Sequence, residues 1–206
     1  MALRIVLFVL LILVFHGFFL WSLFGSRLRH AYEVRNLTKV NYRVIRPIVD
    51  KQDYRLINEI EISLDAERKS TLHFDHMIFG EKYIYLIVDK FWWVGLGGKR
   101  DDDSWVYYKK SHKGRIYIDN PLKMNALRKE KFSLYMGMNP DLFIPIILVN
   151  NDCVLEVEGE ESEDNFIIHR KKLKKLLKEL ESRDVSSLND DELQQVVYAI
   201  HRKNRL

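Results

Sequence analysis

The chain has 206 residues, of which 47% are hydrophobic and 30% charged, with one cysteine, nine glycines and four prolines. This composition excludes a collagen-like chain, a disulfide scaffold and a disordered tail. The formal net charge of +4 comes mainly from the first thirty residues, which hold three arginines and no acid. The basic balance therefore gives little reason by itself to infer a nucleic-acid-binding surface.

The segment from Ile5 to Phe24 is uncharged and almost wholly apolar. As a helix it is about 30 Å long, enough to cross the hydrocarbon core of a membrane. A cleaved signal peptide is the competing interpretation, but the residues after the segment form only a poor cleavage site. Because Arg27 and Arg29 follow the segment, we expect a single-pass membrane protein with its C-terminal side in the cytoplasm. The lone Cys153 agrees, because it forms no intrachain disulfide.

No internal repeat and no linker rich in Pro, Gly or Ser divides the rest of the chain. We therefore expect a membrane anchor over residues 1–30, one folded domain over 31–169 and an amphipathic helical tail over 170–206. Apolar residues before position 53 favour a short helix at the start of the domain, which Pro47 disturbs unless the helix bends or begins there.

Alternating polar and apolar residues predict strands over Tyr54–Leu64, Thr71–Phe79 and Tyr83–Val88. Short turn-like breaks separate them, which indicates an antiparallel meander. Ser104–Tyr108 and Arg115–Ile118 are typical of a further hairpin.

A helix is predicted over Asn120–Met136, with a proline in its first turn. The wholly apolar run Phe143–Val149 follows, as expected of a buried parallel strand. Its Pro145 requires a bulge or an edge position, because proline donates no hydrogen bond. Cys153–Val157 and Asn165–His169 flank an acidic run and favour a hairpin with a solvated loop.

Two helices are expected in the tail. Leucines spaced three and four apart from Leu173 to Leu180 form the apolar stripe of the first, with lysines on its other faces. The second begins with Asn189 as N-cap and Glu192 as its capping-box partner.

The predicted order is helix, three meandering strands, helix and apolar strand. This αβββαβ order resembles that of metal-dependent PD-(D/E)xK nucleases, so the fold class we expect is a mixed α+β or α/β domain. Four motifs then resemble the NERD family, the nuclease-related domain: HFDHMIF at 73–79, IYLIVDK at 84–90, GLGG from residue 95 and NPLKMN at 120–125. In that family the GLGG-like motif is a turn after the strand that carries E-x-K.

The resemblance implies that Asp75 is the metal-binding aspartate and that Lys90 is the catalytic lysine. The glutamate of the family's E-x-K motif is Val88 here, so the implied active site is degenerate and the sequence leaves enzymatic activity open. Asp89 is adjacent, but strand alternation points it away from Lys90, so replacing the missing carboxylate needs a bulge or a slip of one residue.

A metal site, if the chain is active, involves Asp75, Asp89 and His73, with Mg²⁺ or Mn²⁺ as the cofactor. His73 shares a face with Asp75 by alternation, whereas His76 falls on the other face in a packing role. No other cofactor is expected.

Lys90, Lys99 and Arg100 are expected to contact nucleic-acid phosphates. The alternative for Lys90 is an ordinary sheet residue whose ammonium extends to water. The three aspartates at 101–103 are typical of a solvated turn.

The leading hypothesis is a membrane-anchored, NERD-like protein, catalytically impaired, that acts in the binding or processing of DNA or another nucleic acid. The alternatives are an active metal-dependent nuclease that uses Asp89, and a membrane-tethered scaffold. The scaffold binds a protein or lipid through the C-terminal helices and the surface around Trp92 and Trp93.

Overall fold

The computed structural model describes residues 2–64, 70–108 and 114–203. It divides into two compact units, Met1–Leu37 and Thr38–Leu206. The second unit, called the folded unit below, contains residues 38–169 of the predicted domain together with the predicted tail helices.

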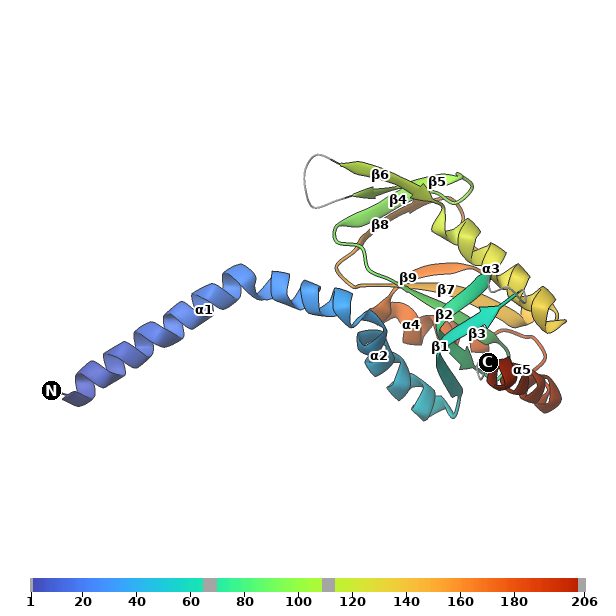
Figure 1. The fold of residues 1–206 in the computed structure, drawn as a ribbon, viewed down its shortest axis with the longest axis horizontal. Helices are drawn as coiled ribbons and strands as arrows, with labels where there is room; N and C mark the ends of the chain where they lie inside the picture. The colour runs from blue at the N-terminus through green and yellow to red at the C-terminus, as the bar shows by residue number, and fades with distance from the viewer. Residues whose placement is uncertain (1, 65–69, 109–113, 204–206) are drawn as a thin grey trace. The chain divides into compact units, whose positions relative to one another are not determined.

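The first unit consists of one long helix, α1 (Ala2–Arg35) (Figure 1). Its large apolar side chains from Val6 to Trp21 are exposed. Tested for length and hydropathy, no single helix of the described residues qualifies as a membrane span. The segments Val6–Ser22 and Phe24–Arg35, bent by 53° relative to each other, qualify only as a pair. The membrane anchor therefore stays a prediction.

The second unit begins with the expected helix, α2 (Leu37–Gln52), which runs through Pro47 without ending there. Its buried residues Asn41, Ile45 and Val49 repeat every four positions, so they form one stripe along the helix. Pro47 lies on the exposed side, where water can hydrogen-bond the carbonyl that the missing N–H leaves free.

The larger sheet has the strand order β1–β2–β3–β7–β9. Strands β1 (Arg55–Ser63), β2 (Thr71–Phe79) and β3 (Ile84–Lys90) pair antiparallel, as the predicted meander requires. Strands β7 (Phe143–Val149) and β9 (Phe166–His169) continue the sheet in parallel with β3. The structure is therefore a mixed α+β fold, and the apolar run is the buried parallel strand that the sequence predicts.

Helices cover both faces of this sheet (Figure 1). Phe132 of α3 (Pro121–Met136) and Val196 of α5 (Asp190–Lys203) pack on one face. Helices α2 and α4 (Leu173–Glu181) pack on the other. Short 3₁₀ turns, η1 (Pro140–Leu142) and η2 (Arg170–Lys172), precede β7 and α4. Asn189 accepts a hydrogen bond from the Asp191 N–H at the start of α5, as its predicted capping role requires.

A smaller sheet has the order β6–β5–β4–β8. The predicted hairpin forms β5 (Ser104–Tyr108) and β6 (Arg115–Asp119). The GLGG motif forms strand β4 (Gly95–Lys99), so the turn that the resemblance implies there is wrong. A Cβ at Gly98 would lie 2.4 Å from the ring of buried Trp105, so the glycine lets this indole pack against the strand.

The predicted hairpin across the acidic run is also wrong. Strand β8 (Val154–Glu158) pairs with β4 of the smaller sheet, whereas β9 pairs with β7 of the larger one. The acidic residues therefore connect two sheets. Strand β8 thus pairs with a strand 59 positions earlier, and β9 pairs with β7 rather than with β8, which spacing alone does not reveal.

Pro145 lies in β7 between two neighbouring strands, but β9 pairs with β7 only from Ile146 onward. At Pro145 the strand therefore has only β3 as a partner and is locally an edge. This is the edge position that the sequence requires for this proline.

Candidate functional site

The candidate site lies where β2 and β3 separate. The two strands pair only from His76 to Phe79 on β2. At the next position, the Asp75 carboxylate accepts a hydrogen bond from the Asp89 backbone N–H at 2.8 Å. A side-chain oxygen thus replaces the main-chain acceptor that β2 no longer provides, and Asp75 occupies the fork between the strands.

Strand alternation is broken at the same point. Phe74 and Met77 pack in the same core cluster although an odd number of positions separates them. On β1, Glu59 has a φ of 52° and is missing from the pairing register. Asp75 and His76 both turn away from that cluster, so the expectation that His76 faces away from Asp75 is wrong.

The Asp75 carboxylate lies close to groups from two elements. Thr38 of α2 donates to its Oδ1 at 3.4 Å, and Nε2 of His73 lies 3.4 Å from the same atom. The shared side predicted for His73 and Asp75 is therefore present. The negative charge of Asp75 also opposes the lowering of the pKa of Arg128 that burial causes. The Asp75 side chain is 15% exposed and that of His73 is 55% exposed, so this part of the fork is open to solvent.

Asp89 is buried and paired with His76. Its Oδ2 lies 3.1 Å from His76 Nε2, and His76 Nδ1 lies 2.7 Å from Asn58 Oδ1. Both ring nitrogens of His76 are therefore occupied by side chains of the network.

Burial raises the pKa of Asp89 above its ordinary value. The hydrogen bond from His76 and the nearby Asn41 amide oppose this rise, whereas the charge of Asp75 adds to it. Asn41 Nδ2 and Asp89 Oδ1 nevertheless complete no hydrogen bond in the described part of the chain. Asp89 thus keeps one buried oxygen without a donor.

Arg170 extends the network to the start of α4. Its guanidinium donates to Asn41 Oδ1 at 3.0 Å, and both side chains are buried. Asn41, Asn58 and Arg170 were not among the site residues predicted from the sequence. Asn41 does leave one signal, since it is a polar residue on the apolar stripe of α2.

The residues at the fork do not fit the divalent-metal site that the resemblance implies. Val88, at the glutamate position, is 5% exposed and belongs to an apolar cluster. Oδ2 of Asp89 already contacts His76. Over residues 2–64, 70–108 and 114–203, no group of three or more His, Cys, Asp and Glu side chains is placed to hold a metal ion.

Lys90 ends β3 and is separated from the Asp75–Asp89 contact. Asp89 lies on the α2 face with His76, whereas Val88 packs in the cluster of α3. By alternation Lys90 lies on the Val88 side, so Asp89 and Lys90 diverge as predicted. Lys90 is partly exposed, and within the described residues its ammonium makes no hydrogen bond or ion pair.

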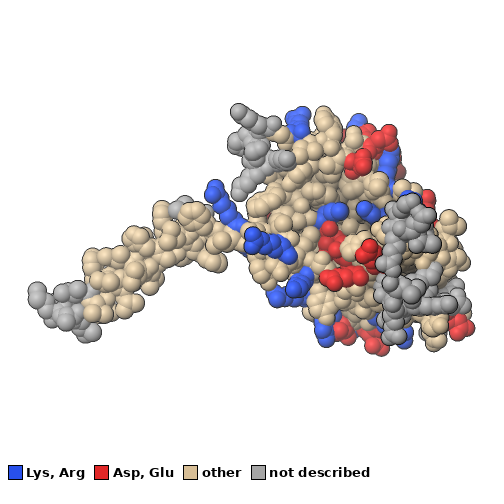
Figure 2. All heavy atoms as spheres, in the orientation of Figure 1, with Lys and Arg blue, Asp and Glu red and all other residues tan. Residues whose placement is uncertain are grey.

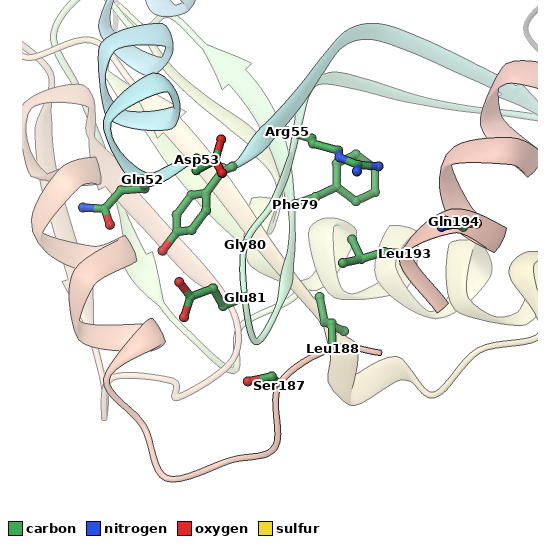
Figure 3. Close-up of a pocket in the computed structure, with 11 residues that line it drawn as sticks. Gln52, Asp53, Arg55, Phe79, Gly80, Glu81, Ser187, Leu188, Leu193 and Gln194 are labelled. Carbon is green, nitrogen blue, oxygen red and sulfur yellow. The ribbon is translucent and has the colours of Figure 1, made fainter. Parts of the chain in front are cut away.

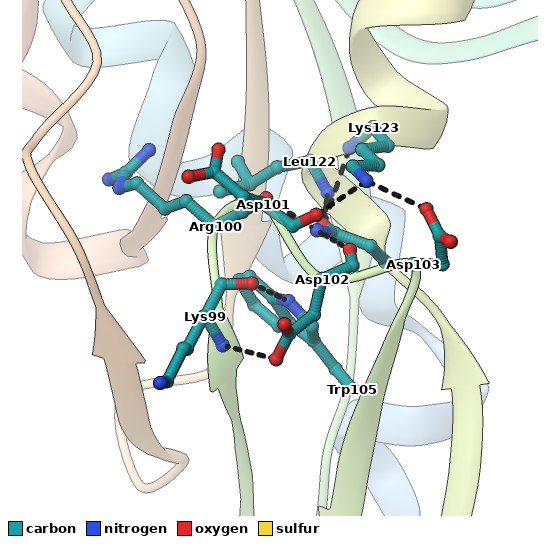
Figure 4. A network of polar contacts seen from close by, with 9 residues as sticks. Lys99, Arg100, Asp101, Asp102, Asp103, Trp105, Leu122 and Lys123 are labelled. Carbon is teal, nitrogen blue, oxygen red and sulfur yellow. Dashed lines mark hydrogen bonds and ion pairs between the residues drawn. The ribbon is translucent and has the colours of Figure 1, made fainter.

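Lys99 and Arg100 lie at the turn between β4 and β5 in the smaller sheet (Figure 4). The three aspartates that follow are exposed, as expected of a solvated turn. The Lys123 ammonium donates to the Asp101 carbonyl at 2.6 Å and lies 2.7 Å from Oδ1 of Asp103. The fold therefore does not place Lys99 and Arg100 in the hydrogen-bond network around Asp75.

Asn120, the first residue of the NPLKMN motif, fixes this turn to α3. Its Nδ2 donates to the carbonyls of Arg100 and Asp102, both at 2.7 Å. Its Oδ1 accepts from the N–H groups of Leu122 and Lys123 as the N-cap of the helix. This motif residue therefore has a structural role independent of any catalysis.

We expect Asn120→Ala to lower the free energy of unfolding by about 2–3 kcal/mol, because it removes a cap and leaves buried backbone groups unpaired. Urea titration of tryptophan fluorescence measures the loss. The control is Asn139→Ala, which removes an exposed cap of η1 and should cost about 0.5–1 kcal/mol. Equal losses for the two variants would contradict the role assigned to Asn120.

Lys129 and Asp164 form an ion pair at 2.7 Å, with side chains 10% and 58% exposed. The hydrogen bond from Lys129 holds the pKa of Asp164 below its ordinary value. The stability that this lowering provides is present above the unfolded pKa, near 4, and is lost as the pH falls through the lowered folded value.

We expect Asp164→Asn to cost about 1–2 kcal/mol at pH 7, because it leaves the buried ammonium without its carboxylate while the exposed side of the pair limits the loss. The difference from the wild type should shrink below pH 4. Urea unfolding at pH 7 and pH 3 tests this, and a constant difference at both values would count against the ion pair.

A groove of about 480 Å³ lies elsewhere, between the start of β1, the β2–β3 turn and the segment before α5 (Figure 3). The Tyr85 hydroxyl donates to Oε1 of Glu181 at 2.5 Å. Burial, together with Glu181 and Glu81, raises the pKa of Tyr54 to about 12. None of the predicted site residues lines this groove.

Lys, Arg, Asp and Glu side chains are interspersed on the face of the folded unit that Figure 2 shows. This agrees with the near balance of charge after residue 30. Comparison with models of protein families, with curated proteins and with solved structures finds no match for this chain.

Proposed function

We propose that the chain is a membrane-anchored, nuclease-related protein. Its cytoplasmic unit is a NERD-like domain of the PD-(D/E)xK type that binds nucleic acid and cleaves it poorly or not at all. The observation that carries the proposal is Asp75 at the fork between β2 and β3, with buried Val88 on β3 at the position of the family's glutamate. The order of α2, three antiparallel strands, α3 and parallel β7 supports the same class.

Binding without cleavage follows from the ligands at the fork. Mg²⁺ in such sites is held by one or two carboxylates together with phosphate oxygens. Here the second carboxylate is replaced by a valine, and Asp89 is occupied by His76. Lys90, partly exposed and without an ion-pair partner in the described residues, is the side chain we assign to phosphate contact.

The test uses the full chain in lipid nanodiscs with plasmid and single-stranded DNA, in the presence of Mg²⁺ or Mn²⁺. We expect no cleavage, and DNA binding that weakens steeply with salt because counterions are released. Lys90→Ala should weaken binding about threefold to tenfold. Lys174→Ala, which removes an exposed cation on α4, should leave binding unchanged.

A second candidate is an active nuclease that uses Asp89. The hydrogen bond between Asp75 and the Asp89 backbone favours it, because it brings both residues to the fork. Metal-dependent cleavage that Asp75→Ala and Lys90→Ala both abolish would establish this candidate and overturn the first. Absence of salt-dependent DNA binding would favour the membrane-tethered scaffold instead.

A further inference from the structure

Strand β9 forms one end of the larger sheet. Its residues Phe166–His169 pair with β7 on one side, and within the described residues no strand pairs with the other side. An edge strand of this kind presents unpaired N–H and C=O groups to any extended chain that lies beside it.

A groove of about 470 Å³ lies along this edge, lined by Phe166, Ile167 and Ile168. Leu176 of α4 joins Phe166 and Ile168 in an apolar floor that stays partly exposed. The groove therefore combines the two features that bind an extended peptide, namely main-chain hydrogen-bonding groups and apolar contacts for alternate side chains.

Charged side chains form the walls of the groove. The cations are Arg100, Lys172, Lys175 and Arg183, and the carboxylates are Glu161, Glu163 and Glu179. Lys175 and Glu179 form an ion pair with each other at 3.4 Å, so they contribute little net charge. The three remaining cations outnumber the two remaining carboxylates, which favours an occupant with acidic side chains.

We propose that this groove binds an extended segment of a partner protein, with alternating apolar and acidic residues, that adds to β9 as a sixth strand. The main chain of the segment pairs with the open edge of β9. Its apolar side chains pack on Phe166, Ile168 and Leu176, and its carboxylates face the cations. The proposal does not depend on nucleic-acid binding at the fork.

The probe is a capped, fluorescent octapeptide of alternating valine and glutamate, titrated against the full chain in nanodiscs by fluorescence anisotropy. We expect it to bind about tenfold more tightly than the valine–lysine peptide of the same pattern. Methylation of alternate backbone nitrogens should abolish binding, because it removes the donors that pair with β9. Hydrogen exchange should show new protection at Phe166–His169 in the complex.

Leu176→Glu should weaken binding of the acidic peptide at least tenfold. The matched control is Leu134→Glu on α3, where the side chain is already 84% exposed and binding should not change. If Leu176→Glu fails to fold, Lys172→Glu on the exposed wall provides the same test and should also weaken binding.

Unchanged binding of the methylated peptide would overturn the proposal, as would peptide binding that leaves the exchange of β9 unaffected. Dimerisation of the chain that Leu176→Glu abolishes would assign the edge to a second copy and also overturn it.

Discussion

Replacing His76 by alanine is expected to lower the free energy of unfolding of the Thr38–Leu206 unit by about 3–5 kcal/mol, the range for breaking a buried charged pair. His76 is fully buried, and both ring nitrogens contact side chains, Asn58 Oδ1 and Asp89 Oδ2. Without the imidazole, Asp89 would keep two buried oxygens and no side-chain donor to Oδ2. Urea unfolding of the full chain in mild detergent, followed by tryptophan fluorescence, measures the loss.

His73→Ala is the matched control, because this histidine is three residues away on the same strand and its side chain is 55% exposed. It should cost less than about 0.5 kcal/mol, as surface substitutions usually do. The double variant His76→Leu with Asp89→Leu should recover much of the stability, since apolar residues can replace a buried pair. Similar losses for His73→Ala and His76→Ala would contradict the network described at the fork.

Much of the fold could be predicted because its signals are local. Alternation in Thr71–Phe79 and the apolar run Phe143–Val149 identify strands before their partners are known. The partners of β8 and β9 could not be predicted, because β8 pairs with a strand 59 positions earlier and β9 pairs with β7 rather than with the neighbouring β8. Gly98 likewise indicates a turn in the sequence, because the close packing of the Trp105 indole against it is a tertiary contact.

The candidate site was less predictable, because it depends on an exception to strand geometry. Alternation placed Asp75 and Lys90 correctly on their strands but put His76 on the wrong face, since nothing local indicates the break between Phe74 and Met77. The contact between Asn41 and Arg170 joins residues 129 positions apart. Such a network follows from tertiary packing and is visible in sequence only as polar residues on apolar stripes.

Val88→Glu restores the carboxylate that the nuclease motif lacks, and it should destabilise the folded unit by about 3 kcal/mol without divalent cations, because it buries a charge. Val88 is 5% exposed and packs in the apolar cluster of α3, whereas Asp75 turns away from that cluster toward α2. A glutamate at position 88 therefore does not meet the Asp75 carboxylate, and Mg²⁺ should return no stability to the variant.

Val88→Gln is the control for the size of the new side chain, because glutamine has nearly the size of glutamate but no carboxylate. It should also destabilise the unit, and we expect Mg²⁺ to stabilise neither variant nor the wild type. Urea unfolding with and without the cation measures this. A gain in stability confined to Val88→Glu would contradict the opposite faces assigned to Val88 and Asp75, because it would mean that one substitution separates this fork from a cation site.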